Sequence, residues 1–213
     1  VPPPICMFYK DPYDGQLRLG DILLKQTTAS ISVNHLKIPY NSDEVNVEVC
    51  KSNYAVVLTP CCSIEQELIV LTPLIHLKNK FNENPYFKED FTRINRSMSP
   101  QQAVSPSVWE GFPPDEKAKR EQEGIRYALL EHFVFEPLVQ LANYKVSFTE
   151  NNQRVEREIG HYMIDFRYVT HVRSKNIKTA DGIFLGSKVA QLTIEARSDL
   201  RKKLAEYYGR IPQ

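Results

Sequence analysis

The sequence predicts an α+β fold, with short strands, a mostly helical segment between them and a helix near the C-terminal end. Two apolar runs end in a Thr-Pro pair, at Pro60 and Pro73. Proline ends a strand because it has no N–H to donate to a sheet. Residues 78–143 are more polar and carry helix-start signals, and the last residues place apolar side chains at helical spacing.

Five strands are predicted before residue 78. The first, at residues 18–26, follows the turn signal Asp11-Pro12-Tyr13-Asp14-Gly15. Residues 30–33 and 45–50 alternate between polar and apolar side chains, as strands with one buried face do. Residues 54–58 and 68–71 are almost continuously apolar, so we expect these two strands to be buried on both faces.

A mostly helical insertion is predicted at residues 78–143, within a single domain that spans residues 1–213. Pro113-Pro114-Asp115 is typical of a helix start. The helix that follows is expected to run towards Pro137, which limits it. Its apolar residues recur at helical spacing: Ile125, Leu129, Leu130, Phe133 and Val134.

The region after the insertion predicts a hairpin, a strand and a helix. Residues 144–149 and 154–159 flank Glu150-Asn151-Asn152, a turn-forming sequence. Residues 162–172 are expected to form one strand. Thr193 is suited to cap the N-terminus of the last helix. The apolar stripe of this helix is Ala196, Leu200 and Leu204, and Gly209 and Pro212 are expected to end it.

The composition excludes some classes of function. The chain has 213 residues, of which 42% are hydrophobic and 25% charged, an ordinary globular mixture. Its net charge of +1 excludes binding to nucleic acid through overall charge alone. However, residues 1–153 carry a net −4 and residues 154–213 a net +5. Two interpretations of the basic C-terminal part stay open: a surface that faces a phosphate backbone, and an ordinary solvated helix face.

The sequence also predicts where the protein works. No apolar run is long enough to cross a bilayer, and no signal peptide opens the chain. Four cysteines are few for this length and favour a reducing compartment. We therefore expect a cytoplasmic protein with no membrane partner.

Several blocks of the sequence follow one another in a recognisable order. Gly20-Asp21-Ile22 opens a first strand, residues 55–60 and 69–73 form a central pair, residues 163–169 form a last strand, and residues 186–193 lead into the closing helix. In this order the blocks resemble the PemK/MazF family, the toxins of many bacterial toxin–antitoxin pairs. The resemblance implies an SH3-type β-barrel, often a homodimer, that cleaves single-stranded RNA without a metal.

The chain departs from this family at the catalytic positions. The family relies on an arginine ahead of the central strand and a threonine shortly after the proline that ends the next strand. Here Lys51 and Ser52 precede the central strand, and Ile75 takes the place of the threonine, although Thr72 stands before the proline. The large insertion is a further departure.

Two functions therefore stay open. The first is a PemK-like protein of a toxin–antitoxin or phage-defence system, which acts on or binds RNA and has an antitoxin or defence-system protein as a partner. In this hypothesis it is a metal-independent endoribonuclease. The second is a non-catalytic protein-interaction module that uses the barrel as a scaffold.

Metal-free RNA cleavage needs a base, an acid and a cation for the phosphate. The candidates nearest the expected groove are Lys51, Thr72 and His76, and histidine titrates in the useful range. The alternative to a catalytic role is that Lys51 is a solvated lysine at a strand edge and His76 a structural residue of a loop. The residues predicted to bind nucleic acid are Arg18, Lys25, Arg167, Arg173 and Lys175. The cysteines lack the spacing of a zinc site, so we predict neither a metal nor a cofactor.

Overall fold

The computed structural model describes residues 8–33, 45–60, 67–96, 106–122, 130–150, 153–177 and 186–209. They form an α+β structure in which every described strand pair is antiparallel, which confirms the predicted fold class. The chain divides into two compact units. Unit 1 comprises Val1–Tyr9, Ile75–Arg167 and Leu192–Gln213, and unit 2 comprises Lys10–Leu74 and Tyr168–Gln191.

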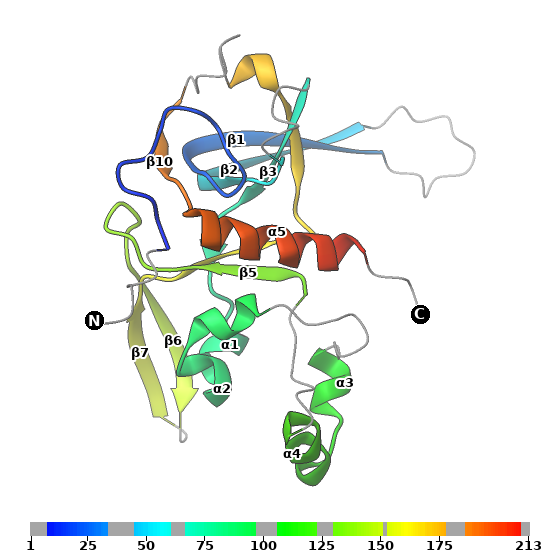
Figure 1. Cartoon of the computed structure of the whole chain (residues 1–213). Helices are drawn as coiled ribbons and strands as arrows, with labels where there is room; N and C mark the ends of the chain where they lie inside the picture. The colour runs from blue at the N-terminus through cyan, green and yellow to red at the C-terminus, as the bar shows by residue number, and fades with distance from the viewer. Residues whose placement is uncertain are drawn as a thin grey trace, which may run out of the picture. The chain divides into compact units, whose positions relative to one another are not determined.

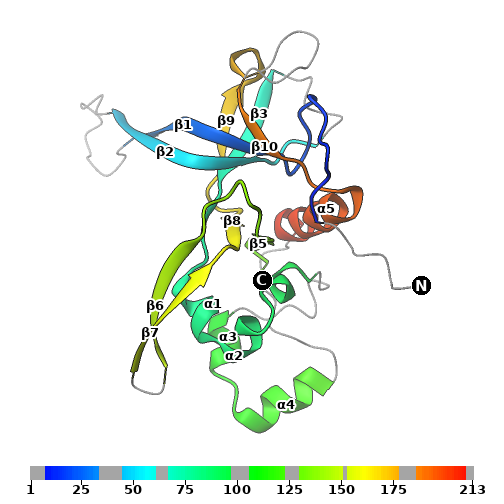
Figure 2. The same ribbon diagram turned by 90° about the vertical axis from the view of Figure 1, so that its left-hand side faces the viewer.

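Unit 2 is built on a five-stranded sheet with the order β10-β1-β2-β3-β9. Its strands are β1 (Ile22–Val33), β2 (Val45–Val57), β3 (Leu68–Pro73), β9 (Thr170–Arg173) and β10 (Lys188–Ala190), and a short 3-10 helix, η3 (Ser174–Asn176), follows β9. The two longest strands, β1 and β2, pair from Ile22 opposite Val56 to Val33 opposite Val45. They form the long ribbon of Figure 2.

The two interruptions predicted in β1 and β2 are absent. The strands predicted at residues 18–26 and 30–33 are one strand, and so are those predicted at 45–50 and 54–58. Cross-strand pairing continues through the polar residues between them, from Gln26 opposite Ser52 to Thr28 opposite Cys50. The local pattern was misleading because strand formation depends on the partner strand more than on intrinsic preference.

The sheet of unit 2 curls around a small apolar core. β1 and β9 contact each other, although β2 and β3 lie between them in the sheet order. The buried residues of this core are Leu17, Leu23, Val57, Ile69 and Leu71. At the entry to β1, Gly20 adopts a φ of 83°, a left-handed conformation that glycine accepts without steric cost.

Unit 1 contains a three-stranded sheet, a hairpin and all the α-helices found among the described residues (Figure 1). The sheet has the order β4-β8-β5, with β4 (Ile75–His76), β5 (His132–Phe135) and β8 (Tyr162–Asp165), and the hairpin is β6 (Tyr144–Glu150) with β7 (Gln153–Ile159). The helices are α1 (Asn79–Glu83), α2 (Pro85–Lys88), the 3-10 helix η2 (Phe91–Asn95), α3 (Pro106–Glu110), α4 (Pro114–Gln122) and α5 (Ile194–Tyr208).

Two predictions for this part of the chain were wrong. Phe133 and Val134 were expected in a helix, but they lie in β5, where all four residues are buried. A short apolar run fits a buried strand as well as a helix, and pairing with β8 decides for the strand. The strand predicted at residues 162–172 is two strands, β8 and β9, in different sheets. The range 78–143 lies within unit 1 and contains α1 to α4, η2 and β5.

Other predictions for this part were confirmed. α4 begins at Pro114, and the hairpin pairs Tyr144 with Ile159 through Glu150 with Gln153. The Thr193 side chain accepts a hydrogen bond from the Ala196 N–H and caps α5, which ends at Gly209. Among the described residues, no helix is both long and apolar enough to cross a membrane.

The packing of α5 predicts a large difference between two apolar residues of the same helix. Leu200 is fully buried, whereas Ile194 is 77% exposed. We expect Leu200→Ala to lower the free energy of unfolding by about 2–5 kcal/mol, because it removes buried contacts and leaves a cavity. Ile194→Ala, the matched control, changes it by less than about 0.5 kcal/mol. Urea denaturation monitored by circular dichroism measures both, and equal effects would contradict this packing.

Candidate phosphate-binding site

A buried carboxylate, that of Asp165, organises the polar site of unit 1. Asp165 ends β8 and is 1% exposed. Its nearest partner is local: the Arg167 guanidinium donates from Nη2 to Oδ2 at 2.6 Å and from Nε to Oδ1 at 2.8 Å, and the Arg167 backbone N–H donates to Oδ1 at 3.1 Å. This two-point contact fixes the plane of the guanidinium.

Two further side chains reach the same carboxylate from distant parts of the chain. Lys78 immediately precedes α1, and its Nζ donates to Asp165 Oδ2 at 2.7 Å. His132 stands directly opposite Asp165 in the β5–β8 pair, with its Nε2 at 3.3 Å from Oδ2. The same Nε2 lies 3.3 Å from Lys78 Nζ. A lysine, a histidine and an arginine nitrogen therefore all lie within 3.3 Å of Asp165 Oδ2.

Burial and hydrogen bonding set the charges of this site. Burial alone would raise the pKa of Asp165, but the hydrogen bonds from Arg167, His132 and Lys78 outweigh it and hold the pKa well below the usual range. Burial lowers the pKa of His132, so the imidazole is neutral at pH 7. Two cations then share the Asp165 carboxylate, and the carboxylate of Glu131 lies 3.9 Å from His132 Nδ1.

The arrangement suits an anion. The Lys78 side chain is 33% exposed and that of Arg167 is 48% exposed, whereas Asp165 and His132 are almost fully buried. The Lys78 and Arg167 nitrogens both lie within 2.7 Å of Asp165 Oδ2, so they are close enough together for one phosphate to contact both. The buried pair orients the two cations, whose side chains are partly exposed to solvent.

Of the predicted residues, Arg167 is the one that the structure places in this site. Lys78, His132 and Asp165 were missed. A weak signal for Asp165 was present in the sequence, because it lies two residues before the predicted Arg167. His132 and Lys78 had no such signal, because they join the site through strand pairing and a helix start far away in the sequence.

The predicted catalytic residues Lys51 and Thr72 both lie in the sheet of unit 2. Thr72 stands opposite Val56 in the β2–β3 pair, and Lys51 is five residues earlier in β2. Side chains alternate along a strand, so Lys51 and Thr72 are directed to opposite faces. Lys51 is exposed, but Thr72 is fully buried and donates its hydroxyl to the Tyr168 carbonyl at 2.7 Å. Their role in cleavage stays a prediction.

The third predicted catalytic residue, His76, lies in β4 of unit 1. Its ring stacks on that of Tyr144 with 3.7 Å between centroids and 3° between planes, and the Tyr162 ring packs edge-on at 5.5 Å. Burial lowers the pKa of His76, although the residue remains exposed. Stacking and exposure together leave its imidazole nitrogens accessible to a ligand.

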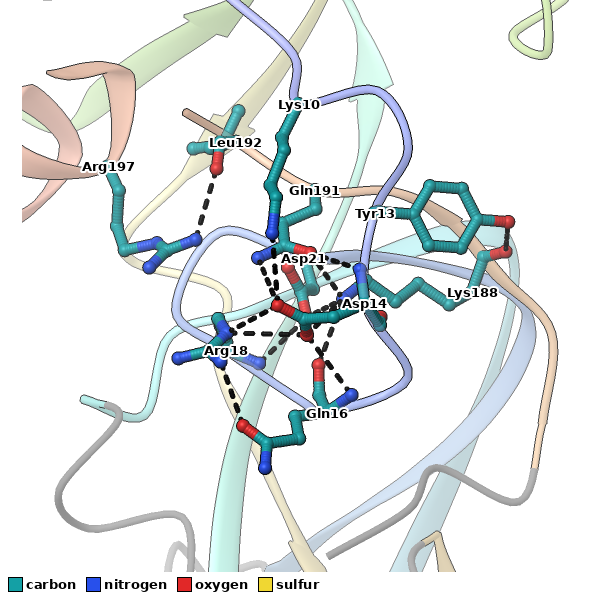
Figure 3. A network of polar contacts seen from close by, with 10 residues as sticks. All are labelled: Lys10, Tyr13, Asp14, Gln16, Arg18, Asp21, Lys188, Gln191, Leu192 and Arg197. Atoms are coloured by element: carbon teal, nitrogen blue, oxygen red, sulfur yellow. Dashed lines mark hydrogen bonds and ion pairs between the residues drawn. The ribbon is translucent and has the colours of Figure 1, made fainter. Parts of the chain in front are cut away.

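The predicted nucleic-acid-binding residue Arg18 belongs to a polar network of unit 2 (Figure 3). Its Nε lies 3.3 Å from Asp14 Oδ2, and its Nη2 donates to Gln16 Oε1 at 2.8 Å. At the centre of the network the nearly buried Lys188 pairs with Asp21 at 2.7 Å. The Arg18 and Lys10 hydrogen bonds outweigh burial and lower the pKa of Asp14 to about 2.

The other predicted nucleic-acid-binding residues also lie in unit 2. Lys25 is in β1. Arg173 ends β9, is exposed, and has its Nε 4.0 Å from Glu67 Oε1. Lys175 is exposed in η3. Arg173 and Lys175 therefore come from adjacent elements of the same unit. The rejected zinc site combined Cys50, Cys61 and Cys62 with His76 or His35, and of these Cys61, Cys62 and His35 lie outside the described residues.

Comparison with known proteins gives no match: no protein-family model, no curated protein and no solved structure is similar to the chain.

The buried carboxylate predicts a pH-dependent stability. Asp165→Asn leaves Lys78 and Arg167 without their counter-charge, so we expect it to lower the free energy of unfolding at pH 7 by about 1–3 kcal/mol, because water screens these two partly exposed cations. In the wild type, the free energy of unfolding falls as the pH drops below about 4, because the unfolded chain binds a proton that the folded carboxylate does not. In Asp165→Asn, the free energy of unfolding falls less steeply with decreasing pH below about 4.

Urea denaturation between pH 3 and pH 7 measures both effects. Asp199→Asn serves as the control, since Asp199 is 59% exposed and pairs with Lys202 at the surface. Its effect on stability is expected to be about 1 kcal/mol or less. Equal acid slopes in the wild type and Asp165→Asn would contradict the assignment of the charge to Asp165.

Proposed function

We propose that the chain is a PemK-like protein that binds single-stranded RNA in a bacterial toxin–antitoxin or phage-defence system. The observation that carries the proposal is the pair of partly exposed cations, Lys78 and Arg167, held at one buried carboxylate. Arginine and lysine together suit a phosphate, because the guanidinium contacts it through two donors and the ammonium adds a point charge. Arg167 also belongs to one of the sequence blocks that resemble the family.

The geometry of unit 2 supports the proposed SH3-type barrel. Its sheet curls until β1 and β9 meet across the intervening strands, around the core of Leu17, Leu23 and Val57. The blocks that resemble the family at residues 20–22, 55–60, 69–73 and 186–193 supply β1, the β2–β3 pair and β10, whereas the block at residues 163–169 contributes to β8 of unit 1. Closure of the curled sheet into a barrel is part of the proposal.

The second candidate function is a non-catalytic interaction module, with a defence-system protein, an antitoxin or a second copy of the chain as partner. The burial of Thr72 favours it, because a hydroxyl that is fully buried and donates to a backbone carbonyl is not available to attack or protonate a substrate. RNA binding without cleavage is consistent with both functions, so binding and turnover need separate tests.

RNA binding is tested by the anisotropy of a fluorescent single-stranded RNA at increasing salt. We expect the affinity to fall steeply with salt, because each neutralised phosphate releases counterions. Arg167→Gln should weaken binding about tenfold and reduce the slope of log affinity against log salt by about 0.7, the share of one phosphate on a single strand. Arg154→Gln is the matched control, an exposed cation of β7 in the same unit.

Salt-independent binding, or equal losses in the two variants, would count against the phosphate contact at Arg167. Circular dichroism of Arg167→Gln shows whether the fold is intact, since Asp165 keeps Lys78 as a counter-charge in this variant.

Turnover is tested by incubating the protein with mixed-sequence RNA in EDTA, beside the Lys51→Ala/His76→Ala double variant. Cleavage by the wild type and not by the double variant is expected of a metal-independent endoribonuclease that uses these residues. Intact RNA in both reactions would favour the interaction module. Equal cleavage in both would place the catalytic residues elsewhere.

A further inference from the structure

A pocket of about 330 Å³ lies on unit 1, between α5, η2 and β5, and is separate from the proposed RNA site. Phe133 of β5 lines the pocket, whereas the neighbouring residue His132 belongs to the phosphate-binding site. Successive side chains of a strand point to opposite faces. The two sites therefore occupy opposite faces of the same strand, and the pocket needs an occupant of its own.

The walls of the pocket are held in place by two buried polar contacts. Asn95 of η2 accepts from the Val134 N–H at 2.6 Å and donates to the Val134 carbonyl at 2.7 Å, which joins η2 to β5. Lys203 of α5 is fully buried and donates to the carbonyls of Ile94 and, at 3.1 Å, Arg96. η2 is thus fixed to both neighbours, and a fixed pocket binds at a lower ordering cost.

The floor of the pocket is aromatic. The rings of Phe8 and Phe133 lie 6.3 Å apart with 28° between their planes, and Phe135 packs edge-on against each of them, at 5.9 Å and 5.4 Å. Phe133 is fully buried, and Ala196 of α5 adds a small side chain beside the rings. The face of an aromatic ring attracts a cation or a flat group.

The rim of the pocket is acidic. It carries Glu136, directly after β5, and Glu195 and Asp199, which are one turn apart on α5 and so lie on the same face of that helix. Two cations, Arg96 and Lys202, accompany these three carboxylates, so the lining has a net charge of −1. Lys202 is paired with Asp199 at 3.6 Å. Burial and the negative charge of Asp90 raise the pKa of Glu136.

We propose that this pocket binds a guanidinium group carried on an alkyl chain, such as the side chain of arginine. The guanidinium plane stacks on the ring of Phe8, the partly exposed ring of the floor, and its N–H groups donate to the carboxylates of Glu136, Glu195 and Asp199. A phosphate is disfavoured by the same three carboxylates. The excess of carboxylates over cations selects a positive ligand, and the flat floor with carboxylates at the rim favours a guanidinium over an ammonium.

The proposal is tested by titrating the ¹⁵N-labelled protein with N-acetyl-arginine amide and following the backbone amide signals of Phe133 and Ala196. We expect saturable shifts of these signals with a Kd on the order of 1 mM, ordinary for a fragment of this size. The citrulline analogue has the same shape without the charge, and we expect it to bind at least about tenfold more weakly. Equal binding of the two compounds would overturn the proposal.

A double variant, Glu195→Gln/Asp199→Asn, removes two of the carboxylates at exposed positions of α5 and should weaken binding about tenfold or more. Glu156→Gln, an exposed carboxylate of β7 outside the pocket, is the control and should leave the Kd unchanged. Equal Kd values for the wild type and the double variant, or shifts confined to residues outside the pocket, would overturn the assignment of the site.

The source of the guanidinium is distinguished by comparing a Gly-Arg-Gly peptide with agmatine, a free guanidine. Tighter binding of the peptide identifies an arginine of a partner protein, and tighter binding of agmatine identifies a small metabolite. Both outcomes support a guanidinium site, and absence of binding by both compounds would overturn it. None of these readouts depends on RNA. They therefore test the guanidinium site independently of the proposed RNA binding.

Discussion

The carboxylate of Asp165 is the interaction on which unit 1 depends most. It joins the end of β8 to the start of β5 through His132 and to the segment before α1 through Lys78, 87 residues away in the sequence. A buried carboxylate is costly unless its oxygens are fully hydrogen-bonded. Here both oxygens accept hydrogen bonds from charged donors. Because the buried carboxylate needs these donors, it fixes the relative positions of the end of β8, the start of β5 and the segment before α1. The contacts with Asp165 also fix where the partly exposed side chains of Lys78 and Arg167 lie.

The two faces of β5 have different electrostatic characters. On one side Lys78 and Arg167 share the Asp165 carboxylate, and on the other side Glu136, Glu195 and Asp199 outweigh two cations. A strand of four buried residues separates these environments. The polyanion and the guanidinium that we propose as ligands would therefore have separate places to bind.

The sequence predicted elements whose signals are local. The hairpin of β6 and β7, the start of α4 at Pro114 and the Thr193 cap of α5 each depend on neighbouring residues, and each is confirmed. Errors came where a distant partner decides: Phe133 is in a strand because β8 pairs with it, and β1 is continuous because β2 is. The candidate site follows the same rule. Arg167 was predicted from a local cluster of basic and aromatic residues, but its partners His132 and Lys78 depend on tertiary contacts that no local pattern encodes.

The path of the chain between the two units has a consequence for biosynthesis. The chain passes from one unit to the other four times, and the outer edge of β1 is covered only when Ala190 of β10 pairs with Ile22. During translation, most of unit 1 leaves the ribosome before the last strands of unit 2 are made. Until then the nascent chain displays an unpaired strand edge, which is a template for association with other chains. A chain whose synthesis pauses between β8 and β10 therefore keeps this edge exposed, and the time available for association with other chains grows with the length of the pause.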